Sequence, residues 1–318
     1  MLRDESTSRT SGGHVRGPGA APPAPTLNGV GRLLPVFWQQ TIRAHAGGLD
    51  VPGILADLFL RHPPDTDGID PVLTRRIFFL LDRTVCRYFR LRVLDVENIP
   101  TGRALVVGCH SGVFAWDATC LVVALYRHTG RFSYNVGDRF FRQLGSVERL
   151  LEATGMVIGE RDRIVRLLER DELVLCFPGG ADDMRRPIWR RYSLGANRGL
   201  RPGRGGYIKA ALRARSPIVP VAVVGAEEIH VNVGDVPALA RLIGAPFFPI
   251  VASPLPLPAR LYIRFGDAIH LDAPPEAADD QDVVDRLNAT VQARLQALIS
   301  DSVRRRQGVY WSRWEDGG

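Results

Sequence analysis

The residues best suited to chemistry lie between His110 and Asp117, just after the apolar run at 104–107. An imidazole with an ordinary pKa of about 6.5 can take a proton from a substrate hydroxyl near neutral pH. A carboxylate beside it would fix the tautomer of the ring and stabilise the imidazolium that forms. The tripeptide His110-Ser111-Gly112 followed by Asp117 therefore predicts a histidine general base supported by an aspartate.

The same residues also have a purely structural interpretation. Asp117 stands directly before the segment 118–128, where it is typical of a helix N-cap, and Gly130 is typical of the helix end. His110 is then an ordinary loop histidine. Positions seven apart on one continuous helix are about 10 Å apart along its axis. A direct bond between the two side chains therefore requires His110 to lie on a loop that folds back over the helix start.

Other nucleophilic and metal-based chemistries lack their residue patterns. Cys109 adjoins His110, but adjacent residues on an extended segment point to opposite sides, which disfavours a cysteine–histidine pair. The sequence has no CxxC or HExxH pair, no GxSxG elbow and no phosphate loop around its only lysine, Lys209. Cysteines without metal spacing in apolar surroundings are typical of reduced core residues in a cytosolic protein. They are Cys86, Cys109, Cys120 and Cys176.

Two further segments have the composition of anion sites. The apolar run 173–176 predicts a buried strand that ends in a glycine-rich turn, whose backbone amides can hold a phosphate or an oxyanion. Arginines follow this turn within a few residues. Glycines and a cation also open the predicted helix at 206–215, as an anion site at a helix start requires. The candidate binding residues are Phe177, Pro178, Gly179, Gly180, Arg185, Arg186, Arg204 and Gly206.

Positive charge is concentrated in one stretch of the chain. The formal net charge is +7, and residues 182–215 contain ten cations against two anions, so the remainder is close to neutral. Such a stretch attracts the phosphate of a cofactor, a lipid headgroup or a nucleic acid, and it is equally typical of a solvated surface. Arginine supplies every cation except Lys209, which we attribute to a GC-rich genome rather than to nucleic-acid binding.

Composition divides the chain into four stretches. Residues 1–28 are rich in Ser, Gly, Pro and Arg and have too little apolar surface to offset the entropy of ordering, which predicts a disordered tail. They also lack the hydrophobic region of a secretory signal. We predict a helical segment over 29–92, the main domain over 93–300, and a basic C-terminal tail over 301–318.

Short apolar strands alternate with helical patterns after Arg92, which indicates an α/β sheet flanked by helices. The predicted strands are 91–96, 104–107, 173–177, 218–224 and 260–265. The predicted helices are 117–128, 140–154, 162–170, 206–215 and 283–300.

Two stretches bear on membrane contact. Residues 71–83 have an apolar centre flanked by arginines, which is too short and too charged to span a bilayer but suits its interface. Packing against the main domain is the alternative. Residues 244–258 are apolar, uncharged and rich in proline. They suit a cover over the core, the lining of an acyl channel or contact with a membrane.

Four blocks, taken in order, resemble the glycerolipid acyltransferase superfamily. Within it, the chain is most similar to bacterial phospholipid/glycerol acyltransferase-like proteins and to relatives of diacylglycerol acyltransferase 2. The resemblance covers about residues 90–270, and four ordered blocks are more specific than any one of them. The blocks are His110-Ser111-Gly112 through Asp117, Phe177-Pro178-Gly179-Gly180, Gly203-Arg204-Gly205-Gly206 and Pro217-Ile218-Val219-Pro220-Val221.

The resemblance implies an α/β domain that transfers an acyl group from a thioester to a hydroxyl. In that scheme His110 takes the proton of the acceptor hydroxyl, Asp117 orients His110, and coenzyme A or a carrier thiol departs. The backbone near Gly179 and Gly180 would hold the acceptor or the oxyanion. The cations that would pair with phosphate are Arg185, Arg186 and Arg204.

No cofactor is implied beyond acyl-CoA as a co-substrate. The expected partners are acyl-CoA or an acyl-carrier protein, a lipid acceptor, and a membrane surface. We therefore expect a cytoplasmic protein that associates peripherally with the inner face of the cell membrane.

The sequence departs from the usual family pattern in two places. Six residues separate His110 from Asp117, where the family usually has four; six is found in its glycine-containing bacterial and neutral-lipid branches. Gly179 stands where the family usually has the glutamate of Phe-Pro-Glu-Gly. That glutamate is tied to glycerol phosphate binding, so its absence favours a neutral lipid acceptor. The arginines argue for a phosphorylated acceptor if they face it.

Three functions follow from these observations. The first is an O-acyltransferase at a membrane surface, and the second is a non-catalytic acyl-CoA or lipid-binding protein on the same fold. Intact His110 and Asp117 favour the first. The third is a basic nucleic-acid-binding protein, which lacks a recognisable groove-reading helix or aromatic-rich sheet, so no nucleic acid is expected as a partner.

Overall fold

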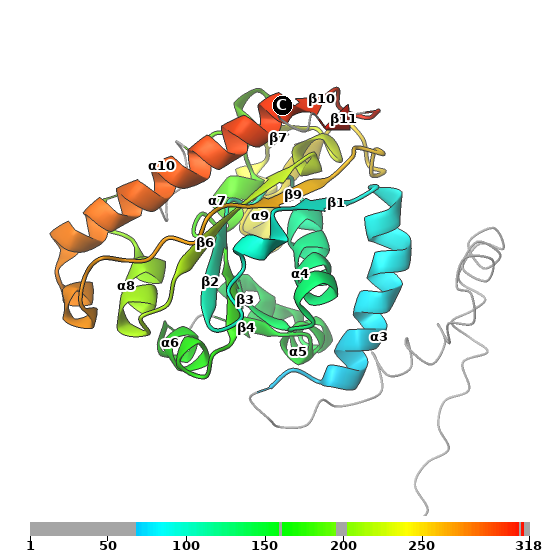
Figure 1. The fold of residues 1–318 in the computed structure, drawn as a ribbon. Helices are drawn as coiled ribbons and strands as arrows, with labels where there is room; N and C mark the ends of the chain where they lie inside the picture. Colours follow the sequence, from blue (N-terminus) through cyan, green and yellow to red (C-terminus); the bar gives the residue numbers. More distant parts are fainter. Residues whose placement is uncertain (1–67, 159–160, 195–201, 312, 315–318) are drawn as a thin grey trace, which may run out of the picture. The chain divides into compact units, whose positions relative to one another are not determined.

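The computed structural model describes residues 68–158, 161–194, 202–311 and 313–314 (Figure 1). All of them belong to one compact unit that spans His45–Gly318. The predictions of a disordered tail over 1–28 and of helices over 29–67 lie outside the described residues.

A seven-stranded sheet forms the centre of the described structure, in the order β1-β9-β6-β2-β5-β3-β4. β2, β3, β4, β5 and β6 run parallel to one another, whereas β9 is antiparallel to β6 and parallel to β1. The bounds are β1 Arg92–Leu94, β2 Ala104–Gly108, β3 Ser133–Gly137, β4 Met156–Ile158, β5 Leu173–Cys176, β6 Ile218–Val224 and β9 Tyr262–Phe265.

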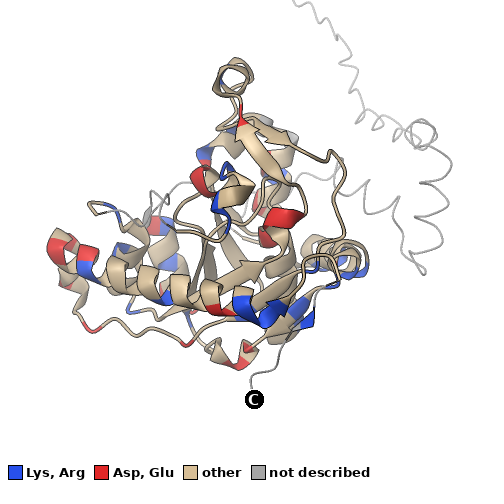
Figure 2. Cartoon of the chain, turned by 90° about the horizontal axis from the view of Figure 1, so that it is seen from above, with Lys and Arg blue, Asp and Glu red and all other residues tan. Residues whose placement is uncertain are grey.

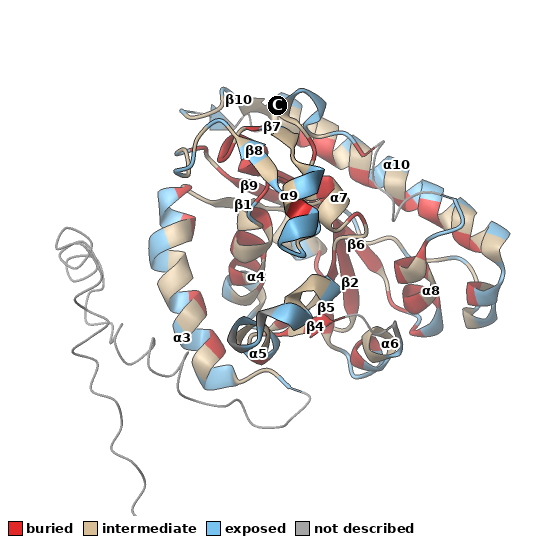
Figure 3. Ribbon diagram, turned by 180° about the vertical axis from the view of Figure 1, so that it is seen from behind, coloured by how far each residue is buried: buried red, intermediate tan, exposed pale blue. Residues whose placement is uncertain are grey.

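Helices cover both faces of the sheet (Figures 1 and 3). α3 (Pro71–Leu81), a π-helical turn (Asp82–Cys86) and α4 (Trp116–Thr129) pack on one face. α6 (Arg161–Glu169), α8 (Gly206–Arg213) and α10 (Gln281–Arg305) pack on the other. The central strands β2, β5 and β6 are therefore buried on both sides, which explains their unbroken apolar sequences.

The remaining elements lie around the edges of the sheet. β7 (Asn232–Asp235) pairs with β8 (Pro249–Val251), and α9 (Pro237–Leu242) lies between them in the chain. β10 (Arg306–Gln307) pairs with β11 (Arg313–Trp314). The short helices are α5 (Ser146–Ala153) and α7 (Ala181–Met184), and 3-10 turns span Val96–Asn98, Arg139–Leu144, Ile188–Arg190, Ala226–Glu228 and Pro275–Asp279.

The predicted fold class is confirmed, with differences in individual elements. All five predicted strands are present, but β3 and β4 were not predicted. β3 has the mixed sequence Ser-Tyr-Asn-Val-Gly, and its pairing with β5 outweighs that weak strand pattern. The predicted helix at 140–154 is a 3-10 turn followed by α5.

The structure corrects one predicted boundary and defines two stretches more closely. α10 continues to Arg305, so the tail predicted from residue 301 begins as an ordered helix. Part of the proline-rich stretch 244–258 is the strand β8 rather than a plain loop. In α3, Phe78 is buried against the rings of Tyr126 and Phe132, so this helix packs on the domain. None of the helices within the described ranges is long and apolar enough to cross a bilayer.

The connections that follow β2 and β5 leave the sheet toward opposite faces. β2 leads into α4 on one face, whereas the chain after β5 reaches α8 on the opposite face. Because β2 and β5 are parallel neighbours, the two connections diverge above their carboxyl ends. In open α/β sheets, ligands bind at such a divergence.

Candidate active site

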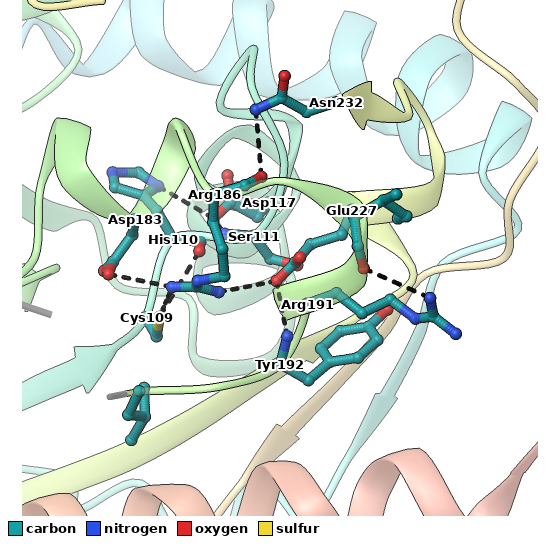
Figure 4. A network of polar contacts seen from close by, with 12 residues as sticks. Cys109, His110, Ser111, Asp117, Asp183, Arg186, Arg191, Tyr192, Glu227 and Asn232 are labelled. Carbon is teal, nitrogen blue, oxygen red and sulfur yellow. Dashed lines mark hydrogen bonds and ion pairs between the residues drawn. The ribbon is translucent and has the colours of Figure 1, made fainter. Parts of the chain in front are cut away.

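His110 and Asp117 meet at the carboxyl end of β2. The loop after Gly108 folds back over the start of α4 and places His110 Nδ1 3.0 Å from Asp117 Oδ2. The backbone N–H of Ser111 donates to the same carboxylate oxygen at 2.7 Å. Asp117 is completely buried and makes no capping bond at the helix start. The observed arrangement is the contact between the two side chains, not the N-cap alternative (Figure 4).

Backbone geometry holds this loop in place. Gly112 has φ +86°, and a Cβ there would lie 2.5 Å from the carbonyl oxygen of Ala226, so the loop packs directly on the turn after β6. Ala115 adopts a left-handed conformation with φ 51° and allows α4 to begin at the next residue. Asp117 therefore lies in the first turn of α4, where the helix dipole favours a negative charge.

The ring of His110 lies flat against Phe177, which follows β5. The two ring centroids are 3.9 Å apart and the planes are inclined by 15°. The side chain of His110 is 15 % exposed. Because Nδ1 faces Asp117, the nitrogen that can face a substrate is Nε2.

Burial lowers the pKa of His110, but the charge of Asp117 and its hydrogen bond raise it, and the resulting pKa lies above 6.5. Cys109 behaves differently, because burial followed by the charge of Asp183 raises the pKa of its thiol well above the usual value. A neutral, buried thiol is a poor nucleophile. This agrees with the expectation that Cys109 and His110 do not form a nucleophilic pair.

The turn predicted to bind an anion is closed by its own backbone. Phe177 and Pro178 lead into it, and the N–H of Gly180 donates to the carbonyl of Phe177 at 3.0 Å. A Cβ on Gly179 would lie 2.1 Å from Oδ2 of Asp183, so that carboxylate occupies the space a side chain would need. The expected oxyanion role of the Gly180 amide therefore requires this turn to open.

Arg185 and Arg186 point in different directions. Arg186 is buried and donates to Glu227 at 2.9 Å, to Asp183 at 3.1 Å and to Cys109 Sγ at 3.0 Å. The side chain of Arg185 is 38 % exposed and pairs with Asp235 at 2.6 Å. Both guanidinium groups therefore already have carboxylate partners, which weakens the case for a phosphate on either of them.

Arg204 and Gly206 lie at the start of α8, which packs on the face opposite α4. Arg204 is exposed, and its carbonyl accepts a hydrogen bond from Gln281 at 3.2 Å. Because α8 precedes the parallel strand β6, its start lies at the same edge of the sheet as His110. Within the described residues, no hydrogen bond or ion pair joins Arg204 to His110.

A buried chain of polar groups extends from the loop after β2, and the sequence pattern did not predict it. Asp183, Arg186 and Glu227 are followed by Tyr192, whose N–H donates to Glu227 at 3.1 Å and whose hydroxyl donates to Glu228 at 2.5 Å (Figure 4). Arg306 then donates to Glu228 at 2.8 Å. These residues join the loops after β2, β5 and β6 to the end of α10.

The charges in this chain compensate one another. Burial raises the pKa of Asp183, which the charge of Arg186 and hydrogen bonds from Cys109 and the His110 amide oppose. Burial likewise raises the pKa of Glu227 to about 7, against the lowering effect of Arg186. One signal was available in the sequence. Glu227 and Glu228 follow the apolar strand β6 closely, and the ends of parallel strands meet at one edge.

Comparisons with known proteins identify the family of the chain. The Acyltransferase family model matches residues 90–224. The chain is 34% identical over 288 residues to an uncharacterised protein of Mycobacterium leprae, covering 83% of this chain and 77% of the relative. The chain belongs to the glycerolipid acyltransferase superfamily. It is therefore an acyltransferase.

The chain also has a more distant sequence relative and a similar solved structure. A Gallus gallus protein named "DGAT1/2-independent enzyme synthesizing storage lipids" is 26% identical over 204 residues, with 64% of this chain and 57% of that protein covered. The crystal structure of the 1-acyl-sn-glycerophosphate (LPA) acyltransferase PlsC from Thermotoga maritima superposes with a TM-score of 0.50 at 14% identity. It covers 86% of this chain and 94% of that chain, which establishes the shared fold.

Proposed function

We propose that the protein transfers a fatty acyl group from acyl-CoA to the hydroxyl of a lipid acceptor, with His110 as the general base. The observation that carries this proposal is the 3.0 Å contact between His110 Nδ1 and the buried Asp117 carboxylate. It holds Nδ1 protonated, so that Nε2 can accept a proton. The raised pKa of His110 supports its conversion to the imidazolium during the reaction.

The proposed reaction needs only His110 and Asp117 for its proton transfers. Nε2 of His110 takes the proton of the acceptor hydroxyl as the oxygen attacks the thioester carbonyl carbon. A carbon–oxygen bond forms, and the carbonyl oxygen carries the negative charge of a tetrahedral intermediate. When the intermediate collapses, the carbon–sulfur bond breaks and the sulfur takes the proton back from His110. Asp117 stabilises the transient imidazolium.

We further propose a neutral lipid alcohol, such as a mono- or diacylglycerol, as the acceptor. Gly179 has no carboxylate, and the carboxylate of Asp183 in its place is already bound to Arg186. Arg185 and Arg186 are both paired, which removes the main argument for a phosphorylated acceptor at this turn. The exposed Arg204 is then the candidate to bind a phosphate group of the acyl-CoA donor. The protein would work at the inner face of the membrane, where such acceptors reside.

Thiol release from long-chain acyl-CoA tests the proposal. Purified protein is assayed with lysophospholipid, monoacylglycerol, diacylglycerol or fatty alcohol, and with acyl-carrier protein as an alternative donor. We expect release that depends on a neutral acceptor and falls by about 10²–10⁴-fold in His110→Ala. Tight acyl-CoA binding without turnover would replace the proposal with the non-catalytic alternative.

A further inference from the structure

Residues 232–257 leave the main sheet as a separate apolar excursion. The ribbon of β7 and β8 carries α9, and most of α9 is exposed (Figure 3). Large apolar side chains project from this excursion into solvent, with Leu242 80% and Leu255 72% exposed. The full set is Val233, Leu242, Ile243, Phe248, Ile250 and Leu255. Large exposed apolar patches on soluble domains mark interaction sites.

Charge is nearly absent from this excursion. Charged residues make up 24% of the whole chain, yet between positions 236 and 257 the only one is Arg241. The outer part of the excursion is accordingly almost entirely tan in Figure 2. Apart from Asp235, which pairs with Arg185, the excursion has exposed aliphatic side chains, one exposed cation and no acidic group, which matches the interface of an anionic bilayer.

The apolar excursion is also attached to the active site. Asp235 in β7 pairs with Arg185 at 2.6 Å, and the amide of Asn232 donates to the carbonyl of Arg186 at 3.1 Å. His230, just before β7, packs edge-to-face against Phe114 of the catalytic loop, with 4.7 Å between ring centroids. The loops that carry the catalytic site thus directly support the excursion.

We propose that the apolar excursion docks the protein on an anionic lipid surface, next to the catalytic histidine. The inference deepens the proposed function, on which it rests for the lipid nature of the acceptor. Leu242, Ile243 and Leu255 enter the headgroup–acyl boundary, and Arg241 contacts the lipid phosphates. The bilayer then brings acceptor molecules close to His110.

The helix α3 is the alternative membrane contact and supplies a matched control. Its Phe78 is buried in the core, and its exposed apolar residues are Val72 and Phe79. Arg83 lies over the ring of Phe79, 4.9 Å from its centroid. The comparison is therefore between an exposed apolar pair on α3 and an exposed apolar set on the excursion.

Vesicle flotation with the full chain distinguishes these surfaces, using vesicles of phosphatidylglycerol and phosphatidylcholine. The triple variant Leu242→Ser, Ile243→Ser, Leu255→Ser is expected to bind on the order of tenfold more weakly or worse, because apolar burial is lost. The control variant Val72→Ser, Phe79→Ser is expected to bind like the parent. Unchanged binding of the triple variant would overturn the proposal, as would loss of binding in the control alone.

Site-specific labelling gives a second measurement that does not depend on destabilising changes. All four native cysteines are buried, so Leu242→Cys provides an accessible thiol for an environment-sensitive fluorophore. We expect a blue shift of its emission on adding vesicles and none for a label on Val147→Cys, an exposed position on α5. No shift at position 242 would contradict docking. A shift that follows self-association without vesicles would assign the surface to a second copy of the chain instead.

Two further readouts separate this inference from the proposed function. His110→Ala is expected to bind vesicles like the parent, because it lies outside the excursion. The triple variant is expected to retain acyl transfer to a detergent-dispersed acceptor while losing transfer to vesicle-borne acceptor. Equal transfer to both acceptors would contradict the docking inference and leave the proposed function standing.

Discussion

The chemistry attributed to His110 depends on one fully buried partner. Asp117 receives hydrogen bonds from the Ser111 amide and from His110 through the same oxygen. These bonds and its place in the first turn of α4 stabilise its negative charge without exposure to water. The stacked ring of Phe177 restricts the imidazole on one side. The histidine is thereby held in one orientation with Nε2 available.

The activity should have an acidic limb set by His110. The base must be neutral, and because its pKa is raised above 6.5, kcat/KM should fall as pH decreases through a value above 6.5. Asp117→Asn removes the charge that raises this pKa, so the limb should move to lower pH while kcat falls by about 10²–10⁴-fold. A pH–rate profile of both proteins measures this. An unchanged limb in Asp117→Asn would contradict the pairing.

Among the elements, the turn between β5 and α7 has no space for a side chain at position 179. The carboxylate of Asp183 fills the space beside Gly179 and is held there by Arg186. The family's usual glutamate therefore has no room at position 179. In its place, an ion pair internal to the protein connects this turn to Glu227 after β6.

Restoring the family glutamate should damage the protein. In Gly179→Glu the new side chain would overlap the Asp183 carboxylate and place like charges together, so we expect a loss of about 1–3 kcal/mol from overpacking alone. Adding Asp183→Ala should recover part of this loss, because the new carboxylate can then approach Arg186. Urea unfolding provides the measurement. An unchanged midpoint in the single variant would show that the turn is not constrained in this way.

Arg185 and Arg186 should contribute very differently to the free energy of unfolding. Arg186→Met leaves Asp183 and Glu227 buried without their cation, which typically costs about 3–5 kcal/mol. Arg185→Met breaks partly exposed pairs with Asp235 and Asp182, each typically worth about 1 kcal/mol or less. Both variants are compared by urea unfolding. Equal losses would mean that the buried network does not support the site.

At the scale of the whole molecule, the polar chain joins the active-site edge to the end of α10. Arg306 and Glu228 are both almost completely buried and lie 78 positions apart in the sequence. The hydroxyl of Tyr192 also donates to Glu228 and accepts from the Gly225 amide. The residues just after α10 are therefore part of the structure that supports the loops after β2, β5 and β6.

Removing this connection should lower stability. Arg306→Met is expected to cost about 2–3 kcal/mol, less than a fully unpaired buried charge, because Tyr192 and Arg191 still face Glu228. Arg304→Met, at an exposed position in the last turn of α10, should change stability by less than about 0.5 kcal/mol. Thermal unfolding of the two variants makes the comparison. A larger loss of stability in Arg304→Met than in Arg306→Met would contradict the role of Arg306 in the buried polar chain.

Features that depend on local pattern can be predicted from the amino-acid sequence. The apolar runs of β2, β5 and β6 predict strands of an α/β sheet, and the spacing of His110 and Asp117 predicts a loop over a helix start if their side chains are to meet. The pairing of the buried charges, by contrast, depends on contacts between distant parts of the chain. Arg186 meets Glu227 across 41 positions and Cys109 across 77, so no local pattern reveals that this cation is occupied. Similarly, β3 is a strand because β5 provides its hydrogen bonds, not because its own residues favour one.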